Sequence, residues 1–130
     1  MNDQEFEEQK RRVVAVVDEW LPLLGLDHWT VGMDFERGEL KDAGVSEDWQ
    51  GLGRCKANWP YQTARIEFFL KGFVDMESGD VEHHVVHELV HCLLDEIQPD
   101  TSDVRAWQQN EHAIEMTARA LLRVKYLGVR

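Results

Sequence analysis

The stretch 81–97 reads VEHHVVHELVHCLLDEI and contains the motif His87-Glu88-Leu89-Val90-His91. Its apolar residues recur with the spacing of an α-helix, at Val86, Leu89, Val90, Leu93 and Ile97. The opposite face carries polar residues with the same period, at His84, His87, Glu88, His91 and Asp95. The pattern predicts a helix with one face in a core and the motif along a polar ridge.

The chemistry of the motif follows from the spacing of its histidines. Residues four apart on a helix lie on one face, about 6 Å from each other, so His87 and His91 can bind one metal ion. Glu88 lies beside them, where it can act as a general base and take a proton from metal-activated water. This arrangement is typical of a zinc-dependent peptidase. The alternative interpretation is a solvated, histidine-rich helix face.

A third metal ligand is expected from the last helix, predicted over residues 102–126. Its apolar stripe comprises Val104, Trp107, Ile114, Ala118 and Leu121. Glu111 falls on this stripe between Trp107 and Ile114, and a buried carboxylate needs a partner or a metal ion. Glu115, one turn further along, is placed to accept a hydrogen bond from a ligand histidine.

These residues together resemble the gluzincins, the thermolysin-like zinc peptidases. The resemblance rests on the motif from His87 to His91, followed by Asn110-Glu111 and then Glu115. It implies Zn²⁺ as cofactor, Glu111 as third ligand, and Asn110 and Glu115 as residues that support the ligands. Glutamate at position 115 departs from the aspartate of that family.

The competing metzincin class requires a glycine and a third histidine after the motif. Those positions hold Leu94 and Ile97, which we assign to the core stripe. We expect His83 at the surface, because it lies about 12 Å along the helix from His91. A structural zinc site, closed by His84 or Asp95, is a further alternative.

The rest of the chain predicts an α+β, zincin-like fold in a single domain, 1–130. An N-terminal helix is expected over residues 3–24, ending near Gly25. Alternating residues predict strands at 29–36, 54–59 and 64–70, the last two paired as a hairpin. The motif helix, capped at Ser78 or Asp80 and stopped by Pro99, and the glutamate helix follow. The polar, glycine-containing segment 38–51 is expected to be a loop bordering the cleft.

The resemblance also implies how a peptide is bound. In zincins the substrate lies along the edge strand that precedes the metal helix, which here is strand 64–70. Ile66, Glu67 and Phe68 are therefore expected substrate contacts, and His84 is expected to line the cleft. Larger relatives stabilise the oxyanion from a second lobe, for which 130 residues leave no room. The candidates for that role are Tyr61, His84, Arg105 and His112.

Composition limits the partners. The formal net charge of −11 disfavours nucleic acid, and no apolar run approaches the roughly 20 residues that span a membrane. The first residues form no apolar signal region, so we expect a cytoplasmic monomer in which Cys55 and Cys92 are reduced.

The expected function is hydrolysis of peptide bonds in a specific intracellular protein, with Glu88 as general base. The alternative is a catalytically weak or inactive zinc-binding module that acts in protein interaction.

Overall fold

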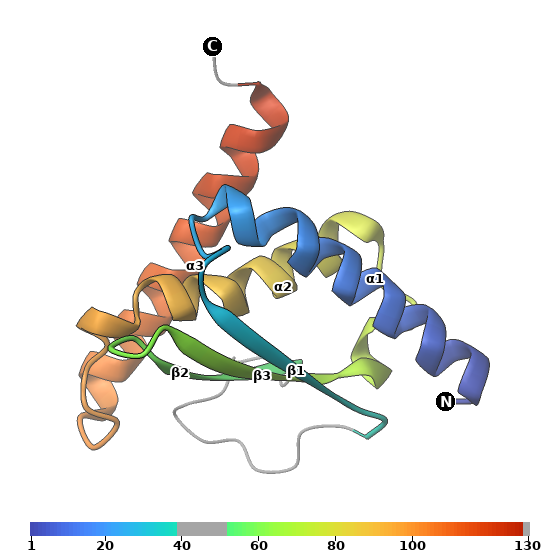
Figure 1. Ribbon diagram of the computed structural model, residues 1–130, viewed down its shortest axis with the longest axis horizontal. Helices are drawn as coiled ribbons and strands as arrows, with labels where there is room; N and C mark the ends of the chain where they lie inside the picture. The colour runs from blue at the N-terminus through green and yellow to red at the C-terminus, as the bar shows by residue number, and fades with distance from the viewer. Residues whose placement is uncertain (39–51, 129–130) are drawn as a thin grey trace.

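The computed structural model describes residues 1–38 and 52–128 (Figure 1). Its elements follow the expected order: α1 (Asp3–Leu23), β1 (Thr30–Glu36), β2 (Gly53–Asn58), β3 (Thr63–Phe69), the 3₁₀ turn η1 (Leu70–Phe73), α2 (Ser78–Leu93), the 3₁₀ turn η2 (Asp95–Ile97) and α3 (Val104–Leu127). The α+β prediction is confirmed. Residues 39–51 of the expected loop lie outside the described residues.

The three strands form one mixed sheet with the order β1-β3-β2. β2 and β3 are antiparallel, as the predicted hairpin requires, whereas β1 runs parallel to β3. The prediction that strand 64–70 lies at an edge is wrong, because β3 is paired on both sides. Alternation along a strand reports which face is buried but not which strands pair with it. Consecutive burial at Phe68, Phe69 and Leu70 is the local sign of a central position.

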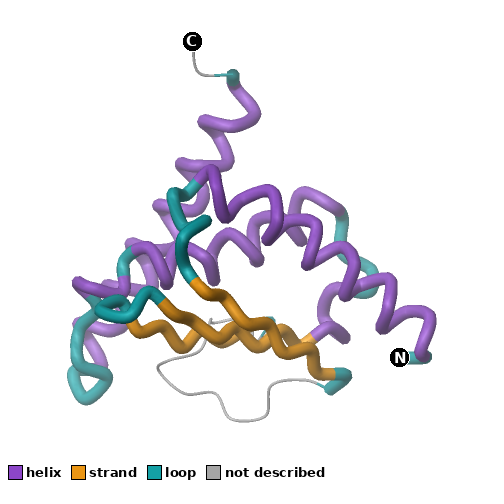
Figure 2. Tube along the Cα trace, viewed as in Figure 1, coloured by secondary structure: helices purple, strands orange, loops and turns teal. Residues whose placement is uncertain are grey.

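Helices α1 and α2 lie on one side of the sheet and pack against each other (Figures 1 and 2). The N-terminus of α1 is fixed by a capping box, in which Asn2 accepts a hydrogen bond from the backbone of Glu5 and returns one through its own backbone. α1 ends before Gly25, whose φ of +71° suits glycine, as expected. The core between these layers includes Val13, Val17, Ile66, Phe68, Val85, Val86 and Leu89.

Helix α2 is enclosed on several sides, since it contacts α1, β2 and α3. The prediction that the motif forms a polar ridge opposite the core is therefore wrong. The motif is buried: His87, Glu88 and His91 are 3%, 1% and 4% exposed. Leu93 and Ile97, assigned to the core stripe, are 40% and 71% exposed. The reason is that α2 ends at Leu93, well before Pro99, and the chain then leaves the helix axis.

The N-terminal ends of α2 and α3 differ in detail from the prediction. α2 begins at Ser78 after Glu77, without a side-chain cap, so neither Ser78 nor Asp80 caps it. α3 begins after Asp103, whose carboxylate accepts a hydrogen bond from the backbone of Ala106. Val104 is 51% exposed, because it precedes the part of α3 that packs on α2.

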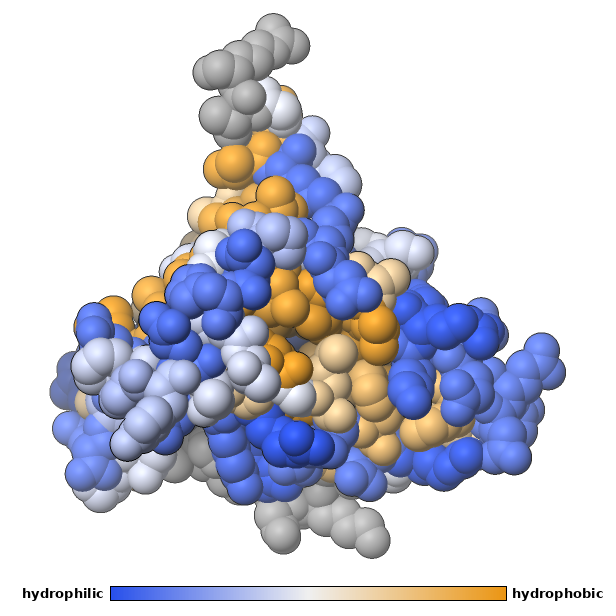
Figure 3. All heavy atoms as spheres, in the orientation of Figure 1, coloured by the Kyte–Doolittle hydropathy of each residue, from blue (hydrophilic) through white to orange (hydrophobic). Residues whose placement is uncertain are grey.

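The C-terminal part of α3 extends beyond the rest of the fold, and apolar residues lie exposed on it (Figure 3). From its last turn, Lys125 and Tyr126 donate hydrogen bonds to the buried carboxylate of Glu82, which also accepts one from Trp20. Glu82 thereby joins all three helices, and the pKa of its carboxyl is lowered: burial raises it, but these three donors outweigh burial.

Candidate metal centre

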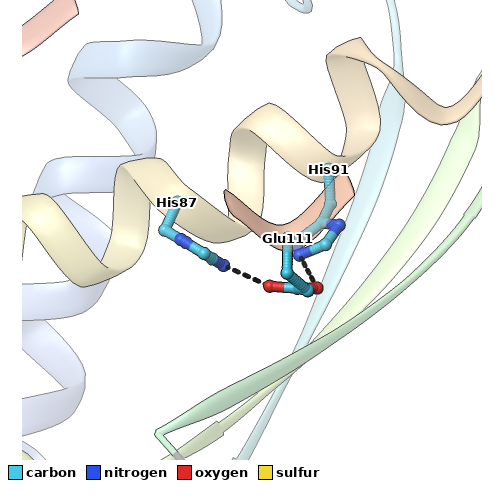
Figure 4. Close-up of side chains that lie close together, drawn as sticks. All are labelled: His87, His91 and Glu111. Carbon is cyan, nitrogen blue, oxygen red and sulfur yellow. Dashed lines mark hydrogen bonds and ion pairs between the residues drawn. The ribbon is translucent and has the colours of Figure 1, made fainter. Parts of the chain in front are cut away.

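Three side chains from two helices meet between α2 and α3. His87 and His91 project from successive turns of α2, and Glu111 projects from α3 toward both rings (Figure 4). One donor atom from each lies within 4.8 Å of the others. Within residues 1–38 and 52–128 this is the group of three or more histidine, cysteine and acidic side chains suited to a metal ion.

Both imidazole rings lie against the carboxylate of Glu111. His87 Nε2 is 3.2 Å from Glu111 Oε2, and His91 Nε2 is 3.0 Å from Glu111 Oε1. Glu111 Oε1 is buried and accepts no hydrogen bond, although His91 is so near. A buried carboxylate oxygen in that position needs a cation, so the residues fit a divalent metal such as zinc.

In the metal-free protein, His87 is held as an imidazolium. Burial lowers its pKa, but the hydrogen bond to Glu111 and the charges of Glu88 and Glu111 raise it, to about 9. The pKa of Glu111 moves the opposite way: burial raises it, and the two histidines lower it to about 2. Metal binding must therefore displace a proton from His87 Nε2.

Glu115 orients His87, as the sequence indicated. His87 Nδ1–H donates to Glu115 Oε1 at 3.2 Å, which leaves Nε2 directed at Glu111. The glutamate side chain is thus long enough to reach this ring from α3. Burial raises the pKa of Glu115, but hydrogen bonds from His83 and His87 lower it overall.

His83 was expected at the surface, and this is wrong. Its Nε2–H donates to Glu115 Oε1 at 2.8 Å, and its ring is only 22% exposed. Arg119 approaches the other carboxylate oxygen of Glu115 at 3.3 Å. His83 lies one turn before His87 on the same face of α2, and that spacing was the signal for a contact with the glutamate helix.

Glu88 points to the opposite side of the cluster, toward the sheet. A Cβ atom placed on Gly53 would lie 2.9 Å from Glu88 Cγ and 3.0 Å from Oε2. Only a glycine at the start of β2 allows this approach. Sequence reasoning missed Gly53, because a glycine before a strand is common and nothing local indicates what packs over it.

Two more residues of α3 surround the ligands. The ring of Trp107 stacks on His91, with centroids 6.5 Å apart and planes at 14°. Its expected position in the core is confirmed, but its contact with a ligand was not foreseen. Asn110, expected to support the ligands, has a buried Nδ2 group with no hydrogen-bond partner among the described residues.

The expected substrate contacts on β3 are wrong. Ile66 and Phe68 are fully buried in the core, facing the helices. Glu67 lies on the other face of the sheet, 3.1 Å from Arg54. His84 packs against His83 and the edge of Phe73.

The structure also locates the residues that were candidates for stabilising the oxyanion or for closing a structural zinc site. Tyr61 is 79% exposed in the turn between β2 and β3. Arg105 and His112 are exposed on α3. Asp95 accepts a hydrogen bond from the backbone of Trp59 at 3.0 Å.

Comparison of the chain with protein-family models, with curated proteins and with solved structures found no match. No helix in the described part of the chain has the length and hydropathy required to cross a bilayer. The chemistry of the cluster is therefore the basis for assigning a function.

Proposed function

We propose that this protein is a zinc-dependent metallopeptidase with a zincin-like fold. The observation that carries the proposal is the convergence of His87, His91 and Glu111, with Glu88 buried beside them. Two histidines and one glutamate are a common ligand set of catalytic zinc, because three protein ligands leave one position for water or substrate. Helix order and the packing of α2 between β2 and α3 support the zincin-like fold.

The residues have distinct roles in this proposal. His87, His91 and Glu111 hold the ion, and Glu115 fixes the ring of His87 through Nδ1. When bound, zinc supplies a Lewis acid that lowers the pKa of water and polarises a carbonyl group. Glu88 accepts a proton from the attacking water and passes it to the leaving amine. Its burial keeps bulk water away from this carboxylate.

The substrate chain is proposed to lie along β2. This strand is paired on one side only among the described strands, so its other side offers backbone groups to an extended peptide. The contact of Gly53 with Glu88 at the start of β2 supports this choice of strand. The peptide would then be extended beside the catalytic carboxylate rather than on β3.

A zinc-binding module that does not cleave is the second candidate, and one observation favours it. Peptide hydrolysis is faster when a side chain donates a hydrogen bond to the oxyanion that forms in the transition state. Losing such a donor costs about 100-fold or more in rate. Tyr61, Arg105 and His112 are exposed, and His84 packs on Phe73.

A comparison of Glu88→Gln with the wild type tests the two candidates. The zinc-loaded proteins are incubated with a diverse peptide library, and products are identified by mass spectrometry. The peptidase makes cuts that Glu88→Gln does not make, while both proteins bind equal zinc. If the wild type makes no cuts although it binds zinc, the peptidase proposal is refuted, and the zinc-binding module that does not cleave is the candidate left.

A second experiment tests the ligand assignment. Glu111→Ala should lower zinc affinity by at least 100-fold, since one of three ligands is lost. His112→Ala is the matched control, because His112 is the exposed neighbour of Glu111 on α3. Unchanged zinc affinity in Glu111→Ala would show that Glu111 is not a ligand.

A further inference from the structure

Two cysteines face each other across the contact between β2 and α2. The Sγ atoms of Cys55 and Cys92 are 3.5 Å apart, although the residues are 37 positions apart in the sequence. Both are free thiols. Cys92 is 1% exposed and Cys55 is half-buried. The two side chains therefore point at each other inside the packed interface of two elements.

We propose that Cys55 and Cys92 are a disulfide-forming pair, joined when the protein meets a two-electron thiol oxidant. A disulfide has an S–S bond of about 2.05 Å, so the sulfur atoms need to approach by roughly 1.5 Å. Rotation of two short side chains and a small displacement of β2 suffice for that. β2 is an outer strand of six residues, paired along one side among the described strands.

The cross-link would join β2 to α2, the helix that carries two of the three candidate metal ligands. Cys92 follows the ligand His91 on α2, and Cys55 lies two residues after Gly53, which touches Glu88. A covalent bond at this point would fix β2 against the helix that carries Glu88. The inference concerns the thiols alone and does not depend on peptidase activity.

Diamide, a diazene that oxidises thiols, is the probe. The Cys55 thiol adds across the N=N bond, and the Cys92 thiol then attacks the Cys55 sulfur. The S–N bond breaks, the S–S bond forms, and the two protons and two electrons lost by the thiols remain on the nitrogen atoms as a hydrazine. The contact with Cys92, burial, and the charges of Glu88 and Asp95 raise the pKa of Cys55, so the thiol reacts more slowly than an exposed cysteine does.

The test treats the metal-free protein of 130 residues with diamide and measures its intact mass. We expect a monomer lighter by two hydrogen atoms, and a proteolytic product in which peptides containing Cys55 and Cys92 are joined. The melting temperature should rise by roughly 10 °C, because the bond closes a long loop. A thiol reductant should reverse both changes.

Cys55→Ser is the control, because this half-buried position tolerates a serine better than the buried Cys92 does. The variant should show neither the mass loss nor the rise in melting temperature. The proposal is overturned if both wild-type thiols stay open to alkylation after diamide treatment, while the same protein cross-links in urea. Disulfide-linked dimers without the intramolecular bond would overturn it equally.

Discussion

Substituting glutamine for Glu111 should destabilise the metal-free protein in a way that depends on pH. Glutamine keeps the shape of the side chain and removes its charge, so the buried imidazolium of His87 loses one of the two carboxylates that lie 3.2 Å from its ring nitrogens. Glu115 still accepts the hydrogen bond from Nδ1. The change therefore isolates the ion pair between His87 and Glu111 from the contact of His87 with Glu115, which also lies on α3.

The magnitude follows from the pKa of His87. A rise from the ordinary value of 6.5 to about 9 corresponds to roughly 3 kcal/mol of stabilisation by its surroundings. The fall of the Glu111 pKa from 4.5 to about 2 gives a similar figure. The two values describe one interaction seen from each partner, so they are not added. Glu88 also contributes to the His87 shift, and we expect Glu111→Gln to cost about 2 kcal/mol.

The pH range is fixed by the direction of each shift. The pKa of His87 is higher in the folded state, so its contribution is complete below about 6.5 and is lost as the pH rises through about 9. The pKa of Glu111 is lower in the folded state, so its contribution is complete above about 4.5 and is lost as the pH falls through about 2. The difference between wild type and variant is therefore largest between pH 4.5 and 6.5.

Urea denaturation in the presence of a chelator measures this difference at pH 5.5 and at pH 9.5. We expect about 2 kcal/mol at pH 5.5 and less than half of that at pH 9.5. His112→Gln, an exposed neighbour, should change stability by less than about 0.5 kcal/mol at either pH. An equal loss for Glu111→Gln at both pH values would refute an ionic His87–Glu111 pair.

Three further outcomes are expected. Gly53→Ala should lower the free energy of unfolding by about 1–3 kcal/mol and any peptidase activity by at least 10-fold, because its Cβ would lie 2.9 Å from Glu88. Gly79→Ala is the control and should leave activity unchanged, because a Cβ there meets nothing within 4 Å. Zinc at 100 times its dissociation constant should stabilise the protein by about 2.7 kcal/mol in calorimetry, and a chelator should reverse this; an unchanged melting temperature would contradict the metal centre. Lys125→Met should lower the free energy of unfolding, measured with urea, by about 2 kcal/mol, because it leaves the buried Glu82 carboxylate without the ammonium group of Lys125. A loss below about 0.5 kcal/mol would contradict that role of Lys125.

The local elements were accessible from the sequence because their causes are local. The helical period predicted α1, α2 and α3, and alternation predicted three strands and the hairpin. The order of elements then favoured an α+β fold. The pairing of His87 with His91 also needs only one turn of helix, and Glu111 was detectable because a carboxylate interrupts an apolar stripe.

What the tertiary structure alone decided is which surfaces meet. It placed β3 at the centre of the sheet, which removes Ile66 and Phe68 from any substrate and leaves β2 as the strand beside Glu88. It also brought His83 to Glu115 and Cys55 to Cys92.

These contacts join residues tens of positions apart, and they depend on how helices pack on a sheet. Periodicity along a single element shows which of its faces is buried, but it carries no record of the element that will cover that face. The sequence by itself therefore determined the elements, the two histidines and the expected third ligand. Packing determined how deeply that centre is buried, and that a glycine and a cysteine of β2 adjoin the motif helix.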